Sequence, residues 1–314
     1  MSNEHRHAHG SLAARAAIAS VGTALFLLLL KAYAAWATGS VAMHGSLADT
    51  GLDVIASLIT LYGVRYAALP ADDDHRFGHG KAEALAALFQ GGLITFSALA
   101  IGWRAVHRLT DGETTAQAEY GIGVSAVAIL VTLCLLAYQR RVIARTGSVA
   151  IEADHVHYQS DLLLNLAVIA ALALEAYAGL TGADPLFGMG IAAWLLFGAW
   201  RASSRAVDQL MDKEWPEERR RQFVEVAARH PALRGIHDLR TRRSGSLNFV
   251  QFHVWVDPQM TVAEAHHVMD EVEEWLEKEF PGTEILIHLD PEGQVDQPGN
   301  PLAETNLTPR TGAP

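Results

Sequence analysis

Two pairs of ionisable side chains lie inside the second and fifth of six long apolar stretches in this chain. Asp49 and Asp53 are four residues apart in one stretch, and His157 and Asp161 are four apart in the other. In a helix, residues at this spacing lie on one face, one turn apart. If the two faces meet, they present three carboxylates and one imidazole, a four-ligand set that suits a tetrahedral divalent cation. The imidazole favours zinc, cadmium, iron(II) or cobalt over magnesium or calcium.

The alternative interpretation places these side chains in water at the ends of their helices. An ionisable group at membrane depth costs about 2.5 kcal/mol or more, which makes that alternative reasonable for one aspartate. It explains two equally spaced pairs on separate helices poorly, so we expect a metal site within the membrane. Glu152 and Asp154 fit the alternative better, because carboxylates in the first turns of a helix interact favourably with its dipole.

A second group of residues that commonly bind metals, one aspartate and two histidines, follows the second apolar stretch. Asp72, His75 and His79 lie in a short connection, with spacings of three and four residues. A solvated polar loop is the alternative to a metal site here. At the N-terminus, His5 and His9 belong to an alternating histidine run that either delivers metal to the membrane helices or is incidental and disordered.

Strand alternation orients several polar side chains after residue 247. Val250, Phe252, Val254 and Val256 point toward a core, which places His253 on the opposite face. His288 and Asp290 are two residues apart and share a face of the last strand. His237 begins a predicted hairpin, and His266 lies on a predicted helix. The alternative for each histidine is an ordinary surface residue.

Six apolar stretches must position the membrane ligands, since about 20 apolar residues are needed to cross a bilayer. They are predicted to form membrane-spanning helices at 12–38, 42–67, 82–108, 118–141, 148–178 and 185–206. Lys and Arg flank the start, the second and fourth connections and the end of the last span, whereas the first and fifth connections contain neither. Both termini should therefore be cytoplasmic. The third connection fits this rule less well, because Arg104 and Arg108 lie near its start.

The remaining sequence predicts a small α/β domain with the element order αββαβ. A helix begins at Pro216, a hairpin turns at Ser244 to Ser246, and Thr261 with Glu264 forms a capping box for a second helix. The predicted organisation is a histidine-containing N-terminus (1–11), a six-helix transmembrane domain (12–210), a cytoplasmic α/β metal-binding domain (211–292) and a disordered tail (293–314).

Composition excludes several classes of function. Half of the residues are hydrophobic, and the net charge of −11 comes mostly from the sequence after residue 206, which argues against nucleic acid as a partner. The single cysteine, Cys134, excludes a disulfide framework and a thiolate metal site. No His-Glu-x-x-His motif is present, and no serine or cysteine has a candidate base nearby, so we predict that the chain is not an enzyme.

Several motifs together resemble the cation diffusion facilitator family, over roughly residues 12–291, and most closely its bacterial zinc and iron efflux subgroup. The matching residues are Asp49-xxx-Asp53 with His157-xxx-Asp161, Gly45-Ser-Leu-Ala-Asp49, the connection from Pro70 to Glu83, and His237-Asp-Leu-Arg-Thr-Arg242.

The resemblance implies a homodimer in the bacterial inner (plasma) membrane, with six helices and a cytoplasmic metallochaperone-like (ferredoxin-like) domain, which exchanges metal for protons. It also implies an interfacial zinc site at Asp72, His75 and His79. A cytoplasmic binuclear zinc site is implied at His237, His253, His266, His288 and Asp290.

The predicted function is therefore efflux of a divalent transition metal, most simply zinc, with cadmium, iron(II) or cobalt as other substrates of the same ligand set. The partners would be metal ions, protons, membrane lipid and a second copy of the chain. The alternatives are a membrane-embedded metalloenzyme and a metal sensor that does not transport. A sensor would not need six spans with buried carboxylates.

Overall fold

The computed structural model describes residues 2–38, 41–111, 122–178 and 183–292. The chain divides into two compact units, His9–Val207 and a smaller one formed by the residues before His9 together with those from Asp208 onward. The predicted disordered tail lies outside the described residues, as do most of the third connection and the predicted start of the fourth span.

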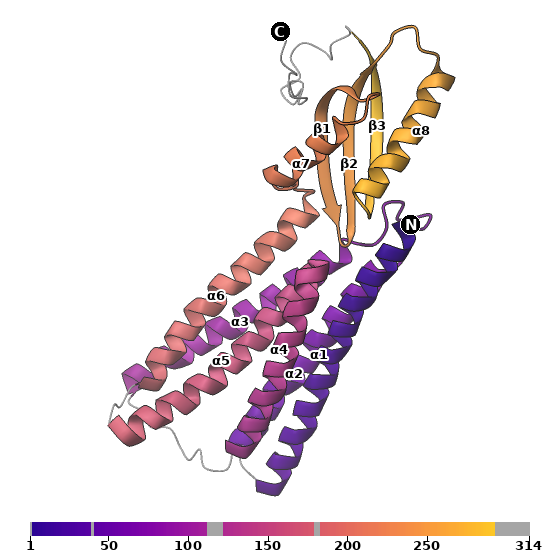
Figure 1. Ribbon diagram of the computed structural model, residues 1–314. Coiled ribbons are helices and arrows are strands. Elements are labelled where there is room, and N and C mark those ends of the chain that lie inside the picture. The colour runs from indigo at the N-terminus through magenta and orange to yellow at the C-terminus, as the bar shows by residue number, and fades with distance from the viewer. Residues whose placement is uncertain (1, 39–40, 112–121, 179–182, 293–314) are drawn as a thin grey trace. The chain divides into compact units, whose positions relative to one another are not determined.

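The larger unit consists of six long helices that lie side by side (Figure 1). Their bounds are α1 (Ser2–Thr38), α2 (Val41–Ala67), α3 (Ala82–Asp111), α4 (Ile122–Thr146), α5 (Val149–Ala178) and α6 (Ala183–Leu210). Helix α1 begins at Ser2 and includes the histidine run, for which disorder was one of the two interpretations. The end predicted for the fourth helix at residue 141 was too early.

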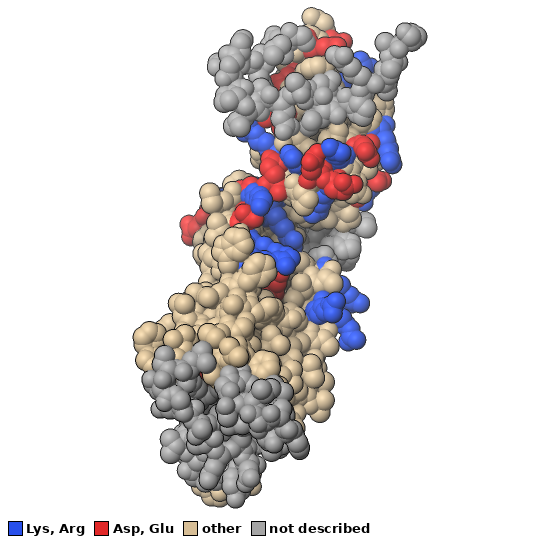
Figure 2. All heavy atoms as spheres, turned by 90° about the vertical axis from the view of Figure 1, so that its left-hand side faces the viewer, with Lys and Arg blue, Asp and Glu red and all other residues tan. Residues whose placement is uncertain are grey.

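Four of these helices are long and apolar enough to cross a membrane by themselves, at Gly10–Ala37, Ala82–His107, Ala126–Thr146 and Pro185–Leu210. The other two long helices, α2 and α5, carry the candidate metal ligands. Large apolar side chains such as Phe96 are largely exposed on this unit, which suits contact with lipid. The face drawn in Figure 2 shows a broad uncharged area on it, with charged side chains gathered toward one end. A helical membrane domain is therefore confirmed, whereas six spans remain a prediction.

Small residues let the helices approach closely. A Cβ added to Gly63 of α2 would lie 2.5 Å from the Ala86 Cβ of α3, and one added to Gly91 of α3 would lie 2.2 Å from the Ser203 Oγ of α6. Such close approach is typical of helix packing in membranes, where dispersion contacts replace the hydrophobic effect. Further along the same pair, α3 and α6 meet through apolar side chains that include Ile94 and Leu195.

The smaller unit has the predicted element order: α7 (Glu217–Ala227), β1 (Arg234–Ser244), β2 (Leu247–Val256), α8 (Val262–Glu279) and β3 (Thr283–Pro291). The strand order is β1-β2-β3, with β1 antiparallel and β3 parallel to β2. Phe223 of α7 and Leu276 of α8 are fully buried against Phe252 and Val254 of β2. Thr261 and Glu264 form the predicted capping box at the start of α8.

Candidate metal centres

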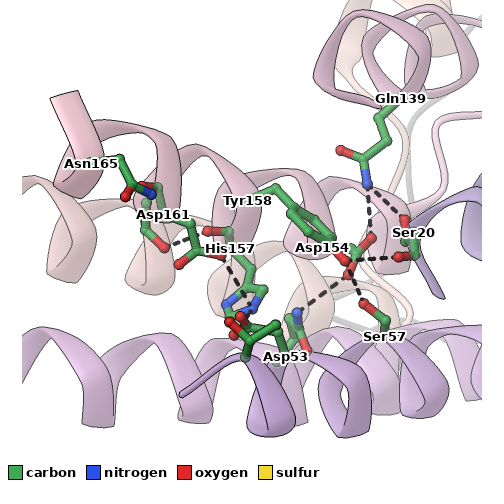
Figure 3. A network of polar contacts seen from close by, with 12 residues as sticks. Ser20, Asp53, Ser57, Gln139, Asp154, His157, Tyr158, Asp161 and Asn165 are labelled. Atoms are coloured by element: carbon green, nitrogen blue, oxygen red, sulfur yellow. Dashed lines mark hydrogen bonds and ion pairs between the residues drawn. The ribbon is translucent and has the colours of Figure 1, made fainter. Parts of the chain in front are cut away.

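The structure brings together three of the four ligands predicted within the membrane. His157 of α5 lies between Asp53 of α2 and Asp161 of its own helix, with its Nε2 3.1 Å from Asp53 Oδ1 and 3.9 Å from Asp161 Oδ2. One ligand atom from each residue lies within 4.8 Å of the others. The imidazole is buried, with 8% of the residue exposed, and both carboxylates are half-buried. Figure 3 shows the three side chains converging from the two helices.

Asp49 is placed differently. It lies one turn before Asp53 on α2, as the spacing predicted, but it is exposed and outside the cluster of three. The cluster thus holds two carboxylates and one imidazole, with Asp49 on the adjoining turn.

A buried carboxylate that we did not assign to a site lies beside this cluster. Asp154 is completely buried, and both of its oxygens accept hydrogen bonds from glutamine side chains. Gln139 Nε2 of α4 lies 2.8 Å from Asp154 Oδ2, and Gln90 Nε2 of α3 lies 3.5 Å from Asp154 Oδ1. The interpretation of Asp154 as a solvated residue at a helix start was therefore wrong, because it faces the centre of the bundle.

Two further helices join this network. Gln139 also donates to Ser20 Oγ of α1, at 3.0 Å. The Tyr158 hydroxyl of α5 donates to the Ser20 carbonyl oxygen at 2.9 Å and lies 2.9 Å from Ser57 Oγ of α2. We call these six residues, which also include Asp154 and Gln90, the polar hub. The polar hub connects all five helices from α1 through α5 by hydrogen bonds of its side chains, and most of these bonds are visible in Figure 3.

The loop between α2 and α3 holds the second predicted cluster. Asp72 Oδ1 lies 3.2 Å from His75 Nδ1, and Asp72 Oδ2 lies 3.2 Å from His79 Nε2. The other ring nitrogen of His79 contacts the Pro70 carbonyl oxygen at 3.1 Å. A proton on that nitrogen leaves Nε2 free for a metal, as in many zinc sites. The backbone N–H of His75 donates to Asp72 and holds the pKa of that carboxyl below its usual value.

The sheet of the smaller unit positions the third cluster. His237, His253 and His288 are direct neighbours across β1, β2 and β3, and Asp290 is two residues further along β3. Asp290 Oδ2 lies 3.1 Å from His237 Nε2 and 2.9 Å from His253 Nδ1, whereas Asp290 Oδ1 lies 3.5 Å from His288 Nε2. The two oxygens of one carboxylate therefore face different histidines.

The fifth residue predicted for this site lies elsewhere. His266 is exposed on α8 and pairs with Asp270, four residues along the same helix, at 3.5 Å. A residue that the sequence did not indicate lies beside the cluster, since Asp238 Oδ2 is 3.6 Å from His253 Nε2. Asp238 has a positive φ of 48° and lies in the second of two irregularities in the β1–β2 register, between His237 and Arg240. A bulge of this kind redirects a side chain in a way that strand alternation does not predict.

Comparison with known proteins identifies the family. The model of the cation efflux transmembrane domain matches residues 17–211, and that of the cytoplasmic domain of cation efflux proteins matches residues 215–292. The chain belongs to the cation efflux, or cation diffusion facilitator, family.

The relatives agree over nearly the whole chain. The cation-efflux pump FieF of Pectobacterium atrosepticum is 43% identical over 289 residues, which cover 92% of this chain and 96% of the relative. FieF of Escherichia coli O127:H6 is 42% identical over 291 residues, with 93% and 97% covered. Among solved structures, the metal-bound C-terminal domain of the CzcD transporter from Thermotoga maritima is 26% identical and covers 26% of this chain and 99% of its own, with a TM-score of 0.24.

Membership of this family determines the general class of the protein. It is an integral membrane protein and a transporter of divalent metal cations rather than an enzyme. The prediction of an efflux transporter is thereby confirmed.

Proposed function

We propose that this chain exports zinc from the cytoplasm in exchange for protons, as a homodimer in a bacterial inner membrane with both termini in the cytoplasm. The observation that carries the proposal is the cluster of Asp53, His157 and Asp161 between two helices of the membrane unit. Ionisable side chains within a membrane helix bundle are costly unless they have a function, and a path for metal ions is a common one.

The ligand types favour zinc. Two carboxylates and an imidazole leave one position of a tetrahedral site, which Asp49 would fill from the preceding turn of α2. Cadmium, iron(II) and cobalt accept the same donors, and we propose them as further substrates. Magnesium and calcium prefer more oxygen ligands and no imidazole.

Proton exchange follows from the chemistry of the ligands. His157 Nε2 and Asp53 Oδ1 face each other at 3.1 Å, so a proton can lie between them in the metal-free site. The same two atoms must be free of protons before they bind a metal. Metal and protons therefore compete for the site, and opening it toward the more acidic side of the membrane releases the metal by mass action. Rocking of the helix bundle would supply the alternating access.

We propose that the other two clusters hold zinc that stays with the protein. In the cytoplasmic cluster, the two oxygens of Asp290 face different histidines, as a carboxylate does when it bridges two ions. We keep His266 as a proposed ligand only on the resemblance to the family, since it pairs with Asp270 on α8 and lies outside the cluster. Zinc at this cluster and at Asp72, His75 and His79 would stabilise the homodimer suggested by the dimer domain of the family.

Metal-driven proton flux tests the proposal. Proteoliposomes that contain a pH-sensitive dye would receive zinc, cadmium, iron(II), cobalt, manganese or magnesium. Zinc and cadmium should move protons, and Asp53→Ala should abolish the flux by removing a ligand. Asp73→Ala is the matched control, because Asp73 is an exposed loop carboxylate paired with Arg76. Unchanged flux in Asp53→Ala, or no flux with any metal in the wild type, would contradict the proposal.

A further inference from the structure

A lysine lies inside the first membrane helix and points into the bundle. Lys31 belongs to the apolar segment Gly10–Ala37 of α1. Its ammonium group donates a hydrogen bond of 2.6 Å to Thr50 Oγ1 of α2. Thr50 is buried, with 1% exposed, and Lys31 itself is half-buried. A lysine that only anchors a helix extends its charge toward water at the membrane surface. Lys31 instead places its charge against a neighbouring helix.

The hydrogen-bond partner of Lys31 is part of the helical face that carries the candidate transport site. Thr50 follows Asp49 and precedes Asp53 by three residues, which is about one helical turn. Asp53 in turn faces His157 of α5 across the helix interface, at 3.1 Å. The Lys31 ammonium is therefore held on the turn of α2 that connects Asp49 to Asp53, without belonging to the ligand set.

A fixed positive charge in this place has two consequences. Three carboxylates and one divalent cation leave one negative charge, which the ammonium cancels, so the loaded site is formally neutral. In the metal-free site, the ammonium interacts with the same carboxylates that the metal needs. The ammonium and the metal ion are attracted by the same negative charges, so each weakens the binding of the other.

We infer that Lys31 is a tethered counter-cation of the transport site, which lowers the affinity of the carboxylates for metal and thereby speeds metal release. The inference rests on the proposed function, since it assigns a role in transport through Asp49, Asp53 and Asp161. Lys31 is a positioning and tuning residue, because it acts through the carboxylates and does not touch the metal.

Initial rates of zinc transport in proteoliposomes test the inference. Lys31→Met should lower the KM for zinc about tenfold, the size of an ordinary coupling between two sites, and should also lower the maximal rate because release becomes slower. Lys31→Arg keeps the charge, so its KM for zinc and its maximal rate should stay near those of the wild type. Thr50→Val removes the hydrogen bond but not the charge, so its KM for zinc should lie between those of Lys31→Met and Lys31→Arg. Arg141→Met, which removes an exposed charge from α4, is the matched control.

An equilibrium measurement separates tuning from damage to the fold. Zinc binding would be titrated in protein that carries His75→Ala and His253→Ala, so that the transport site dominates the signal. Addition of Lys31→Met should then tighten binding by a similar factor. A variant with a lower maximal rate and an unchanged or higher KM would show that Lys31 only supports the fold, and this would overturn the inference.

The two proposals fail in different ways. If the wild type moves no metal, the proposed function fails first. If the wild type transports zinc and Asp53→Ala does not, but Lys31→Met has the KM and the zinc affinity of the wild type, only the role of Lys31 is refuted.

Discussion

Replacement of Asp154 by alanine should destabilise the helical unit by about 2–4 kcal/mol. The carboxylate accepts hydrogen bonds from Gln139 and Gln90, which are both completely buried. Gln139 keeps its second bond, to Ser20, when the carboxylate is removed. The Nε2 of Gln90 loses its bond to Asp154, and within the described part of the chain the Oε1 of Gln90 already has no partner. One buried amide left without partners costs about 1–3 kcal/mol, and the cavity left by the side chain adds about 1 kcal/mol.

Unfolding in mixed micelles with increasing SDS measures this loss. Glu152→Gln is the control on the same helix, because Glu152 is half-exposed and forms an ion pair with Arg205, a kind of contact that contributes about 0–1 kcal/mol. Asp154→Asn keeps one acceptor oxygen and should lose less stability than Asp154→Ala. If Asp154→Ala unfolds at the same SDS fraction as Glu152→Gln, the polar hub does not hold the helices together.

Three further predictions concern the smaller unit. Thr261→Ala should lower the stability of this unit by about 1 kcal/mol through the loss of the N-cap of α8, measured by urea denaturation. The backbone N–H of Thr261 lowers the pKa of Glu264, so the stabilisation from Glu264 is complete above the usual glutamate pKa and disappears as the pH falls through the lower folded value. Glu264→Gln removes the titrating carboxyl and should accordingly flatten the acid side of the pH–stability curve. An unchanged loss of stability at low pH would refute this. Asp290→Asn should lower the number of zinc ions bound per chain, counted by elemental analysis, and should reduce the rise in Tm on zinc addition. Glu284→Gln, a change on an exposed residue of the same strand, should do neither.

Much of the membrane site could be predicted from the sequence, because the spacing of residues along one helix determines which side chains share a face. A spacing of four residues places His157 and Asp161 on one helix face whatever surrounds the helix, and the structure agrees. The same rule contained a signal for Asp154, which precedes His157 by three residues and continues the polar stripe through Tyr158 to Asp161. Its position near the start of the helix suggested water instead, whereas side chains of α3 and α4 cover this turn, and the sequence of α5 alone does not show that packing.

The differences come from information that is not local. An apolar run marks the part of a helix in lipid, but polar residues continue the helix beyond it, as at both the start of α1 and the end of α4. The placement of Asp238 beside His253 depends on a bulge in β1. The contact between Lys31 and Thr50 depends on how α1 packs against α2, which neither segment reveals alone.

The polar hub has a mechanical consequence for the bundle. Five helices, α1 to α5, are linked by hydrogen bonds in a medium without competing water, so shear between them requires several bonds to break together. The sixth helix packs on α3 through apolar side chains around Ile94 and Leu195, and its ion pair with α5 at Arg205 lies near its C-terminal end. Movement of α6 against the other five helices would therefore break mostly apolar contacts, whereas movement within α1 to α5 would break several hydrogen bonds.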